Sequence, residues 1–258
     1  MMNLEPKQKA GILVEALPYI QEYTGKIVVV KYGGNAMVNS DMLKKIGKET
    51  KFVKGLRYTD EETMDIVQMI LCGKVNKNLV RLLEKEGGHG VGLSGMDGSL
   101  FQAVPLKDPD GTEYGYVGDI TGVNETIVLD ALDAGYIPVV SSVAAGADND
   151  TCYNINADTA AEKLAVALKA KKLILLTDVC GLMSTPGDAS SLIPKLKVSE
   201  VPPLVKSGVI SGGMIPKVDC CVEAIRQGVE RANIQDGRIP HSLLIEILSQ
   251  DGVGTMFS

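Results

Sequence analysis

The chain has 258 residues, of which 45% are hydrophobic and 22% charged, and its formal net charge is −6 at pH 7. A chain of this size can form one large domain or two lobes with a sizeable core. Its acidic balance and the absence of a long basic block argue against nucleic acid or an anionic membrane as a partner. No apolar run approaches the ~20 residues of a membrane helix. The first residues lack the apolar core of a signal peptide, so we expect a cytoplasmic protein.

The cysteines and histidines limit which kinds of metal site and catalytic site the chain can form. No two of the five cysteines have metal-ligand spacing, which favours buried thiols in a reducing cytoplasm. With His89 and His241 as the only histidines, a Ser-His-Asp or histidine-metal site is not expected. The cysteines are Cys72, Cys152, Cys180, Cys220 and Cys221.

Residues 7–23 are predicted to form a helix, because apolar residues recur there at helical spacing. Pro18 should kink it. The apolar residues form a stripe along one side of this helix, and the stripe needs burial, either on this chain's own core or on another subunit. Its members are Ala10, Leu13, Val14, Leu17 and Ile20.

Residues 27–31 predict a strand buried on both faces of a parallel sheet, since β-branched residues run there without alternation. Lys31 ends the run, and Gly33 and Gly34 follow. Glycines let a backbone turn sharply and approach a ligand, and a lysine beside exposed N–H groups can hold phosphate. An ordinary strand with a glycine turn and a solvated lysine is the alternative.

The middle of the chain alternates helices, strands and two hairpins. A capping-box sequence at residues 59–62 opens a helix that ends at the Gly87-Gly88 pair. Asp108-Pro109-Asp110-Gly111 is a strong hairpin signal. We also expect a short helix at residues 41–46 and longer helices at 124–134 and 157–168. Strands are expected at 90–94, 101–107, 114–120 and 136–140, and a second hairpin through 146–150.

The last third predicts a buried strand at 173–178, a helix from about Ser211 to Gly228, and then strand 232–235, helix 241–250 and strand 254–257. Strands that alternate with helices indicate an α/β sheet covered on both faces.

Lys217 is predicted to lie in the first turn of a helix, where the macrodipole disfavours a cation. Gly212 and Gly213 precede it, and Pro216 suits a first turn. Together these residues suggest an anion site, although a lysine that extends to water would also fit.

Several polar residues could complete a site. Asp158 is stable near a helix start, although helix capping alone would explain it. Asn154 and Asn156 share one face if their stretch is extended, and Arg57 could fork onto a carboxylate or be a surface charge. No P-loop sequence and no Gly-x-Gly-x-x-Gly after a strand is present. Two lysines at glycine pairs, with an acid to hold them, suit phosphoryl transfer.

Seven motifs resemble the acetylglutamate kinases of the amino-acid-kinase family, across nearly all of residues 26–258. They lie at residues 31–37, 55–57, 73–77, 92–95, 153–158, 176–179 and 211–217. The resemblance implies a three-layer αβα sandwich with a mainly parallel central sheet. It also implies an N-terminal helix (1–25), an acyl-amino-acid lobe (26–172) and a nucleotide lobe (173–258).

The activity implied is transfer of the γ-phosphoryl group of MgATP to the side-chain carboxylate of N-acetyl-L-glutamate, in arginine biosynthesis. By motif position, Lys31 and Lys217 stabilise the transferring group and Asp158 orients both lysines. Substrate contacts fall on Gly33, Gly34, Arg57, Asn154 and Asn156. Nucleotide contacts fall on Asp178, Val179, Gly181, Leu182, Met183, Val209, Ile210 and Ser211. No protein-bound metal is implied, because Mg²⁺ binds through the nucleotide.

The leading helix resembles that of arginine-sensitive relatives, in which such helices interlace dimers into a hexamer, a trimer of dimers. L-Arginine is then the expected feedback inhibitor, with Glu246 and Gly252 as contacts. Asn233 stands where relatives often have histidine, which puts the affinity in question. The resemblance also allows a PII signal protein as a partner.

One departure from the family lies near residues 38–42. A family helix, strand and His-Gly-Gly-Gly loop should follow the first motif, but Ser40 leads straight into Asp41. We favour an incomplete sequence over a true deletion, because losing a central strand would cost far more than typical stability. The alternatives to the proposed activity are a kinase of the same fold acting on aspartate, glutamate or carbamate, and a non-catalytic arginine-sensing or scaffold protein.

Overall fold

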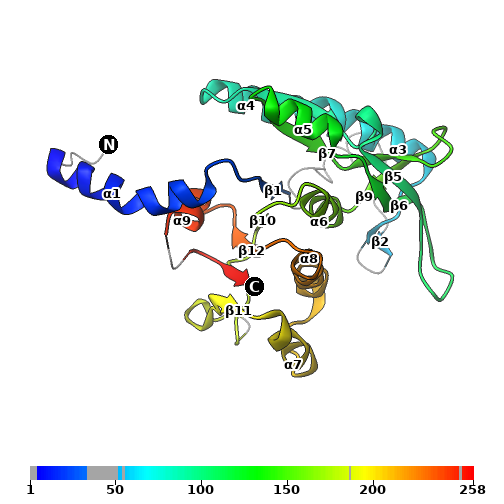
Figure 1. Cartoon of the computed structure of the whole chain (residues 1–258). Coiled ribbons are helices and arrows are strands. Elements are labelled where there is room, and N and C mark those ends of the chain that lie inside the picture. Colours follow the sequence, from blue (N-terminus) through cyan, green and yellow to red (C-terminus); the bar gives the residue numbers. More distant parts are fainter. Residues whose placement is uncertain (1–4, 34–51, 54–55, 186, 250–251) are drawn as a thin grey trace. The chain divides into compact units, whose positions relative to one another are not determined.

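The computed structural model describes residues 5–33, 52–53, 56–185, 187–249 and 252–258. The chain divides into two compact units (Figure 1). Unit 1 combines Met1–Tyr32 with Lys169–Ser258, and unit 2 is Gly33–Leu168. The short helix expected at residues 41–46 lies outside the described residues.

Unit 1 contains a mixed, mainly parallel five-stranded sheet in the order β1-β10-β12-β13-β11. Every pairing in it is parallel except β12 with β13. All six residues of β10 are buried, as its unbroken apolar run predicts for a central strand. The strands are β1 (Val28–Tyr32), β10 (Lys172–Thr177), β12 (Arg231–Asp236), β13 (Thr255–Phe257) and β11 (Lys195–Leu196).

The first strand differs from its prediction in burial. Val29 and Lys31 of β1 are buried, whereas Val30 and Tyr32 are exposed. The strand therefore buries one face rather than two, and Lys31 belongs to the buried face. Because β1 pairs with β10, it clusters with the C-terminal residues, whereas the expected division placed it at the start of the first lobe.

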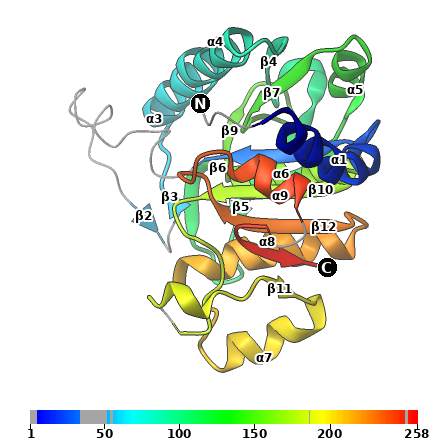
Figure 2. The ribbon, with the colours of Figure 1, turned by 90° about the vertical axis from the view of Figure 1, so that its left-hand side faces the viewer.

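Helices cover the strands of unit 1 on opposite sides (Figure 2). Helix α8 (Ile215–Arg226) packs on β10, β12 and β13, and it buries Val218, Cys221 and Ala224. Helix α9 (Ser242–Leu248) is on the other side and contacts α1 (Pro6–Tyr23). Unit 1 also contains the short α-helix α7 (Val201–Lys206).

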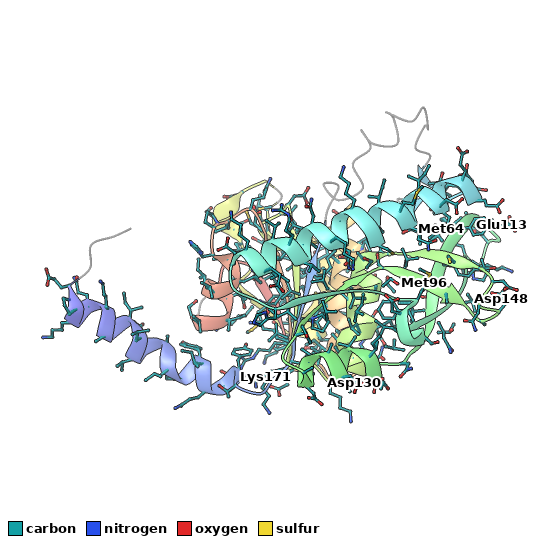
Figure 3. The ribbon with its side chains drawn as sticks, turned by 90° about the horizontal axis from the view of Figure 1, so that it is seen from above. Met64, Met96, Glu113, Asp130, Asp148 and Lys171 are labelled. Carbon is teal, nitrogen blue, oxygen red and sulfur yellow. The ribbon has the colours of Figure 1, made fainter. Side chains whose placement is uncertain are left out.

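Helix α1 confirms the predicted N-terminal helix but buries none of its residues. Its last turn is held by ion pairs from Glu22 Oε1 to Lys171 Nζ (3.4 Å) and to Arg231 Nη1 (3.3 Å). Figure 3 labels Lys171 beside the end of α1. The apolar residues of the helix are left exposed, namely Ile12, Leu13, Val14, Leu17 and Ile20.

A long helical segment of unit 2 contains a π-helix that its sequence pattern did not predict. Helix α3 (Glu61–Gln68) passes into a π-helix (Met69–Val75) and then into α4 (Asn76–Lys85). Asp60 is the N-cap, since its Oδ1 accepts from Thr63 N at 2.8 Å. The expected capping box beginning at Thr59 was therefore wrong by one residue.

The strands of unit 2 form small sheets. β4 (Gly90–Ser94) pairs in parallel with β7 (Ile137–Ser141), and β5, β6, β9 and β8 close into a barrel. Both predicted hairpins are confirmed, since β5 pairs antiparallel with β6 and β8 with β9. The barrel strands are β5 (Phe101–Lys107), β6 (Glu113–Val123), β8 (Val143–Gly146) and β9 (Cys152–Ile155).

The core beneath α3 joins the barrel to the helical segment. Met64 and Val67 of α3 pack with Val143 of β8, and Met96 and Cys152 pack against this cluster. Met64 and Met96 are labelled in Figure 3. Unit 2 also contains the two-residue strands β2 (Phe52–Val53) and β3 (Leu56–Arg57), a 3₁₀ turn (Asp97–Ser99), α5 (Thr126–Asp133) and α6 (Ala157–Ala167). Across the described residues, no helix is both long and apolar enough to cross a membrane.

Candidate active site

The carboxyl ends of parallel strands β1, β10 and β12 form one edge of the unit 1 sheet. Tyr32 lies opposite Leu176, and Thr177 lies opposite Asp236. Open α/β sheets bind ligands outside this edge, because the chain leaves each strand there. The residues that follow the three strands are Gly33, Asp178 and Gly237.

Both predicted catalytic lysines belong to unit 1. Lys31 is buried on β1 opposite Leu175, one residue before the end of the strand. Lys217 is half-buried at the third position of α8, which confirms its place in a helix first turn. A 3₁₀ turn (Gly212–Met214) leads into this helix, and Gly212 has φ +55°, which glycine adopts most easily.

The predicted nucleotide-binding segment 178–183 begins where β10 ends. Val179 N donates to Thr177 Oγ1 at 3.1 Å, and Leu182 N donates to Thr255 Oγ1 at 2.8 Å. A side chain at Gly181 would meet Thr255 Oγ1 at 2.7 Å, and its φ of +143° also requires glycine. Asp178 is exposed, whereas Leu182 is buried. The segment is thus anchored to β13 near its end, at Leu182.

The second predicted nucleotide stretch, residues 209–211, precedes the 3₁₀ turn. Ile210 is buried and its N–H donates to Leu204 O at 3.1 Å. Val209 is half-buried, and Ser211 is exposed and extended. Of the three residues predicted to contact the nucleotide, only Ser211 is therefore exposed to a ligand.

In unit 2, the start of α6 carries the predicted acid. Asn156 is the N-cap, and its Oδ1 accepts from Asp158 N (2.8 Å) and Thr159 N (3.3 Å). Asp158 is 8% exposed in the first turn, where the helix dipole stabilises a carboxylate. Capping is thus performed by Asn156, a predicted substrate contact, and the capping explanation for Asp158 does not hold.

Asn154 on β9 is half-buried and its Nδ2 donates to Thr59 Oγ1 at 3.3 Å. Thr59 is fully buried, and its carbonyl accepts from Tyr116 N at 2.6 Å. A side chain on Gly115 would collide with that carbonyl, and Gly115 has φ +67°. Thr59 lies two residues after Arg57, the last residue of β3. Its hydrogen bond with Asn154 therefore links the end of β3 to strand β9.

The predicted effector contacts come together in unit 1. Glu246 is buried on α9, and its Oε1 is 2.7 Å from both Lys172 Nζ and Asn233 Nδ2. A side chain on Gly252 would collide with Glu246 Oε2, so these two residues are neighbours. The Glu246 carboxylate therefore already has a buried cationic partner.

Sequence reasoning missed three polar residues, namely Thr59, Lys172 and Thr255. The sequence pattern places Thr59 in a helix cap and Thr255 in an ordinary strand, and it leaves Lys172 just before the strand predicted at 173–178, whereas the structure makes Lys172 the first residue of β10. Of the three, only Lys172 carries a signal in the sequence. It stands next to an apolar strand, where a lysine would be buried, and a buried lysine needs a partner. Gly34 lies outside the described residues, and for Arg57 only the backbone is described.

Within the part of the chain that the structure describes, no group of three His, Cys, Asp or Glu side chains gathers as a metal site would require. A Mg²⁺ ion held mainly by nucleotide phosphates and water needs no such cage.

Comparison with known proteins defines the class. The sequence model of the Amino acid kinase family matches residues 13–236. The acetylglutamate kinase of Clostridium beijerinckii is 51% identical over 284 residues, which covers 98% of this chain and 99% of the relative. The chain therefore belongs to the amino acid kinase family, where it groups with the acetylglutamate kinases. Because that alignment runs over 284 positions, the relative has residues with no counterpart among these 258.

Solved structures agree on the fold. The protein smu.665 from Streptococcus mutans UA159 has a TM-score of 0.74 at 30% identity, covering 94% of this chain and 89% of that one. The N-acetylglutamate synthase of Neisseria gonorrhoeae has a TM-score of 0.81 at 23% identity. The match covers 96% of this chain and 63% of the synthase. Because the identity is only 23%, this likeness shows the fold alone. The predicted α/β fold, with mixed and mainly parallel sheets, is confirmed.

Proposed function

We propose that this chain is an acetylglutamate kinase of arginine biosynthesis, which transfers the ATP γ-phosphoryl group to the side-chain carboxylate of N-acetyl-L-glutamate. The observation that carries the proposal is near-full-length identity of about half to enzymes of that activity. The fold supports it, because Lys31 lies near the carboxyl end of parallel strand β1, and Lys217 lies in the first turn of α8 after a glycine turn.

In the proposed reaction, a carboxylate oxygen of the substrate attacks the γ-phosphorus and ADP leaves. Charge accumulates on the phosphoryl oxygens, so cations that meet this charge lower the barrier. We assign this role to Lys31 and Lys217. Asp158 orients both lysines in this proposal, and its burial supports the assignment, since a buried carboxylate is costly without a cationic partner.

The acyl substrate is assigned to unit 2. Arg57 pairs with a substrate carboxylate and Asn154 donates from β9, with its amide oriented by Thr59. Gly33, Gly34 and Asn156 are further proposed contacts. For Asn156 the contact falls to the amide nitrogen, because its oxygen caps α6.

ATP is assigned to the edge of unit 1, along Asp178–Met183 and Val209–Ser211. The support is the position of both segments beyond β10 and before α8. Mg²⁺ enters with the nucleotide and neutralises phosphate charge when bound.

A substrate panel tests the activity. The purified chain is given MgATP with N-acetyl-L-glutamate, L-glutamate, L-aspartate or carbamate, and ADP release is measured together with trapping of the acyl phosphate by hydroxylamine. We expect turnover with N-acetyl-L-glutamate far above the others. Preference for another acceptor would point to a different kinase of this fold. Failure to bind MgATP would support a non-catalytic protein.

We further propose that L-arginine is the feedback inhibitor and that the chain assembles as a hexamer, a trimer of dimers. The support is the apolar stripe of α1, whose large side chains are 45–65% exposed, since exposed apolar patches of this kind mark interaction sites. Glu246 and Gly252 remain the proposed effector contacts. A PII signal protein as a partner and a cytoplasmic location are also proposals, the latter supported by five cysteines of which none forms a disulfide within the described chain.

A further inference from the structure

Arg238 occupies the point where the chain leaves β12, and no role was expected for it. Its Nε donates to Asp236 Oδ1 at 2.9 Å and its Nη2 donates to Asp236 Oδ2 at 2.7 Å. This fork fixes the guanidinium plane against the last residue of the strand. Asp236 is buried, and the hydrogen bonds from Arg238 hold the pKa of its carboxyl below the usual range.

The same guanidinium reaches the neighbouring strand end. Nη2 also donates to the carbonyl oxygen of Asp178 at 2.6 Å, directly after β10. Beside it, Gly237 N donates to Thr177 O at 2.9 Å, which extends the β10–β12 ladder by one bond. Arg238 thus links the ends of two central strands through one side chain.

The link falls on the first residue of the segment assigned to ATP. Thr255 anchors this segment at Leu182, and Thr177 holds Val179. Among the described residues, Arg238 holds the Asp178 carbonyl from just beyond the end of the neighbouring strand β12. Most of the Arg238 side chain is nevertheless exposed, with 69% of its surface accessible. A residue needed only for packing would be buried.

We propose that Arg238 is a positioning residue for the nucleotide, which orders the start of segment 178–183 before ATP binds. The proposal rests on the proposed function, since it takes this segment as the nucleotide site. Without the guanidinium, the segment would have to be ordered during binding, and that entropic cost would weaken affinity for the nucleotide. Affinity for the acyl substrate, which is assigned to unit 2, would be unchanged.

The test compares Arg238→Ala and Arg238→Lys with Arg226→Ala as the matched control. Arg226 is an exposed arginine on α8 that pairs loosely with Glu223 at 4.0 Å. We expect Arg238→Ala to raise the Kd and KM for MgATP on the order of tenfold, through the lost ordering, with the KM for N-acetyl-L-glutamate unchanged. Arg238→Lys should be intermediate, because an ammonium cannot reproduce the planar fork. Arg226→Ala should match the wild type.

Added guanidinium ion at low millimolar concentration should restore part of the MgATP affinity of Arg238→Ala and leave the control unaffected. Unchanged MgATP affinity in both Arg238 variants, or an equal rise in both KM values, would overturn the positioning role. If Arg238→Ala fails to fold, the Lys variant decides. Calorimetry of MgATP binding to the wild type separates the positioning role of Arg238 from the proposed kinase activity. If the wild type binds MgATP but shows no kinase turnover, the proposed activity is overturned. The positioning role is then decided by the Kd values of the Arg238 variants alone.

Discussion

Lys172 Nζ lies 2.7 Å from Glu246 Oε1, and neither side chain is more than 4% exposed. This buried ion pair joins the first residue of β10 to helix α9. Asn233 donates to the same carboxylate oxygen, so strand β12 shares in the link. The arrangement keeps one negative and one positive charge away from water, next to the proposed effector contact Gly252.

Replacing Lys172 with methionine should destabilise the protein by about 3–5 kcal/mol, because it leaves the Glu246 carboxylate buried without its cation. Urea unfolding measures the loss. The double variant Lys172→Met/Glu246→Gln should recover much of it, since no buried charge remains. Lys171→Ala is the control. Its partners Glu22 and Glu230 are 31% and 60% exposed and stay in contact with water when the lysine is removed, so the substitution should cost about 1 kcal/mol or less. Equal losses for both lysines would contradict this account.

Lys217→Ala should lower kcat about 10²- to 10³-fold with little change in KM, since the lysine is assigned to the transition state. Steady-state kinetics with a circular dichroism check of folding gives the answer. Lys206→Ala, at an exposed lysine of α7, serves as the control. A folded Lys217→Ala enzyme with wild-type kcat would remove the lysine from the mechanism.

Asp158→Asn should lower kcat about 10- to 100-fold, because it removes the negative charge of the buried carboxylate that is assigned to orient the two lysines. Helix α6 should remain intact, since Asn156 provides the cap. Wild-type turnover in this variant would show that Asp158 serves structure alone.

Thr59→Val should raise the KM for N-acetyl-L-glutamate about 3- to 10-fold, since one hydrogen bond that orients Asn154 is lost. The KM for MgATP should stay constant. Thr121→Val is the matched substitution, because Thr121 is an exposed β6 threonine whose hydroxyl donates only to Gln102 O at 3.3 Å. A change in both KM values would indicate a general disturbance rather than misplacement of Asn154.

The Asp236 carboxyl should make stability depend on pH in acid. Its pKa in the folded protein is depressed, chiefly by the Arg238 hydrogen bonds, from the model-compound value of 3.8. The stability that it contributes is therefore present above that value and is lost as pH falls through the lower folded value. Urea unfolding across this window should show a weaker pH dependence for Asp236→Asn than for the wild type. Parallel curves would show that the fork does not stabilise the ionised form.

The hexamer and arginine proposals can be decided together. Light scattering should give six chains per particle for the wild type. Leu13→Glu/Leu17→Glu on α1 should reduce the particle to dimers, because charges on the exposed stripe oppose association. Wild-type activity should fall with added L-arginine and that of the Leu13/Leu17 variant should not. A wild-type dimer that ignores millimolar arginine would refute both proposals.

Local sequence patterns predicted the elements of this fold well, because the hydrophobic period reports directly on helices and strands. Helix α1, both hairpins and strands β4, β10 and β12 lie close to their expected residues. The π-helix at Met69–Val75 could not be predicted, since seven residues inside a longer helical segment are too few to change the apolar spacing of the whole segment.

The site was predicted less completely, for a different physical reason. Glycine turns and lysines have local signatures, whereas the partners that orient them are distant in sequence. The hydroxyls of Thr59 and Thr255 pair with groups 95 and 73 residues away. No local pattern specifies such contacts, and the pairing of β1 with β10 across the whole of unit 2 is of the same kind.

The insertion of unit 2 between β1 and β10 has a consequence for biosynthesis on the ribosome. β1 emerges early, but its pairing partner is made only after the whole of unit 2. β13 (Thr255–Phe257) lies between β12 and β11, so the sheet of unit 1 stays open until residues 255–257 have been made. Unit 2 is continuous and can fold while synthesis proceeds. The nascent chain therefore carries an unpaired β-branched strand for most of its elongation, and that strand is the segment for which chaperones and aggregation would compete.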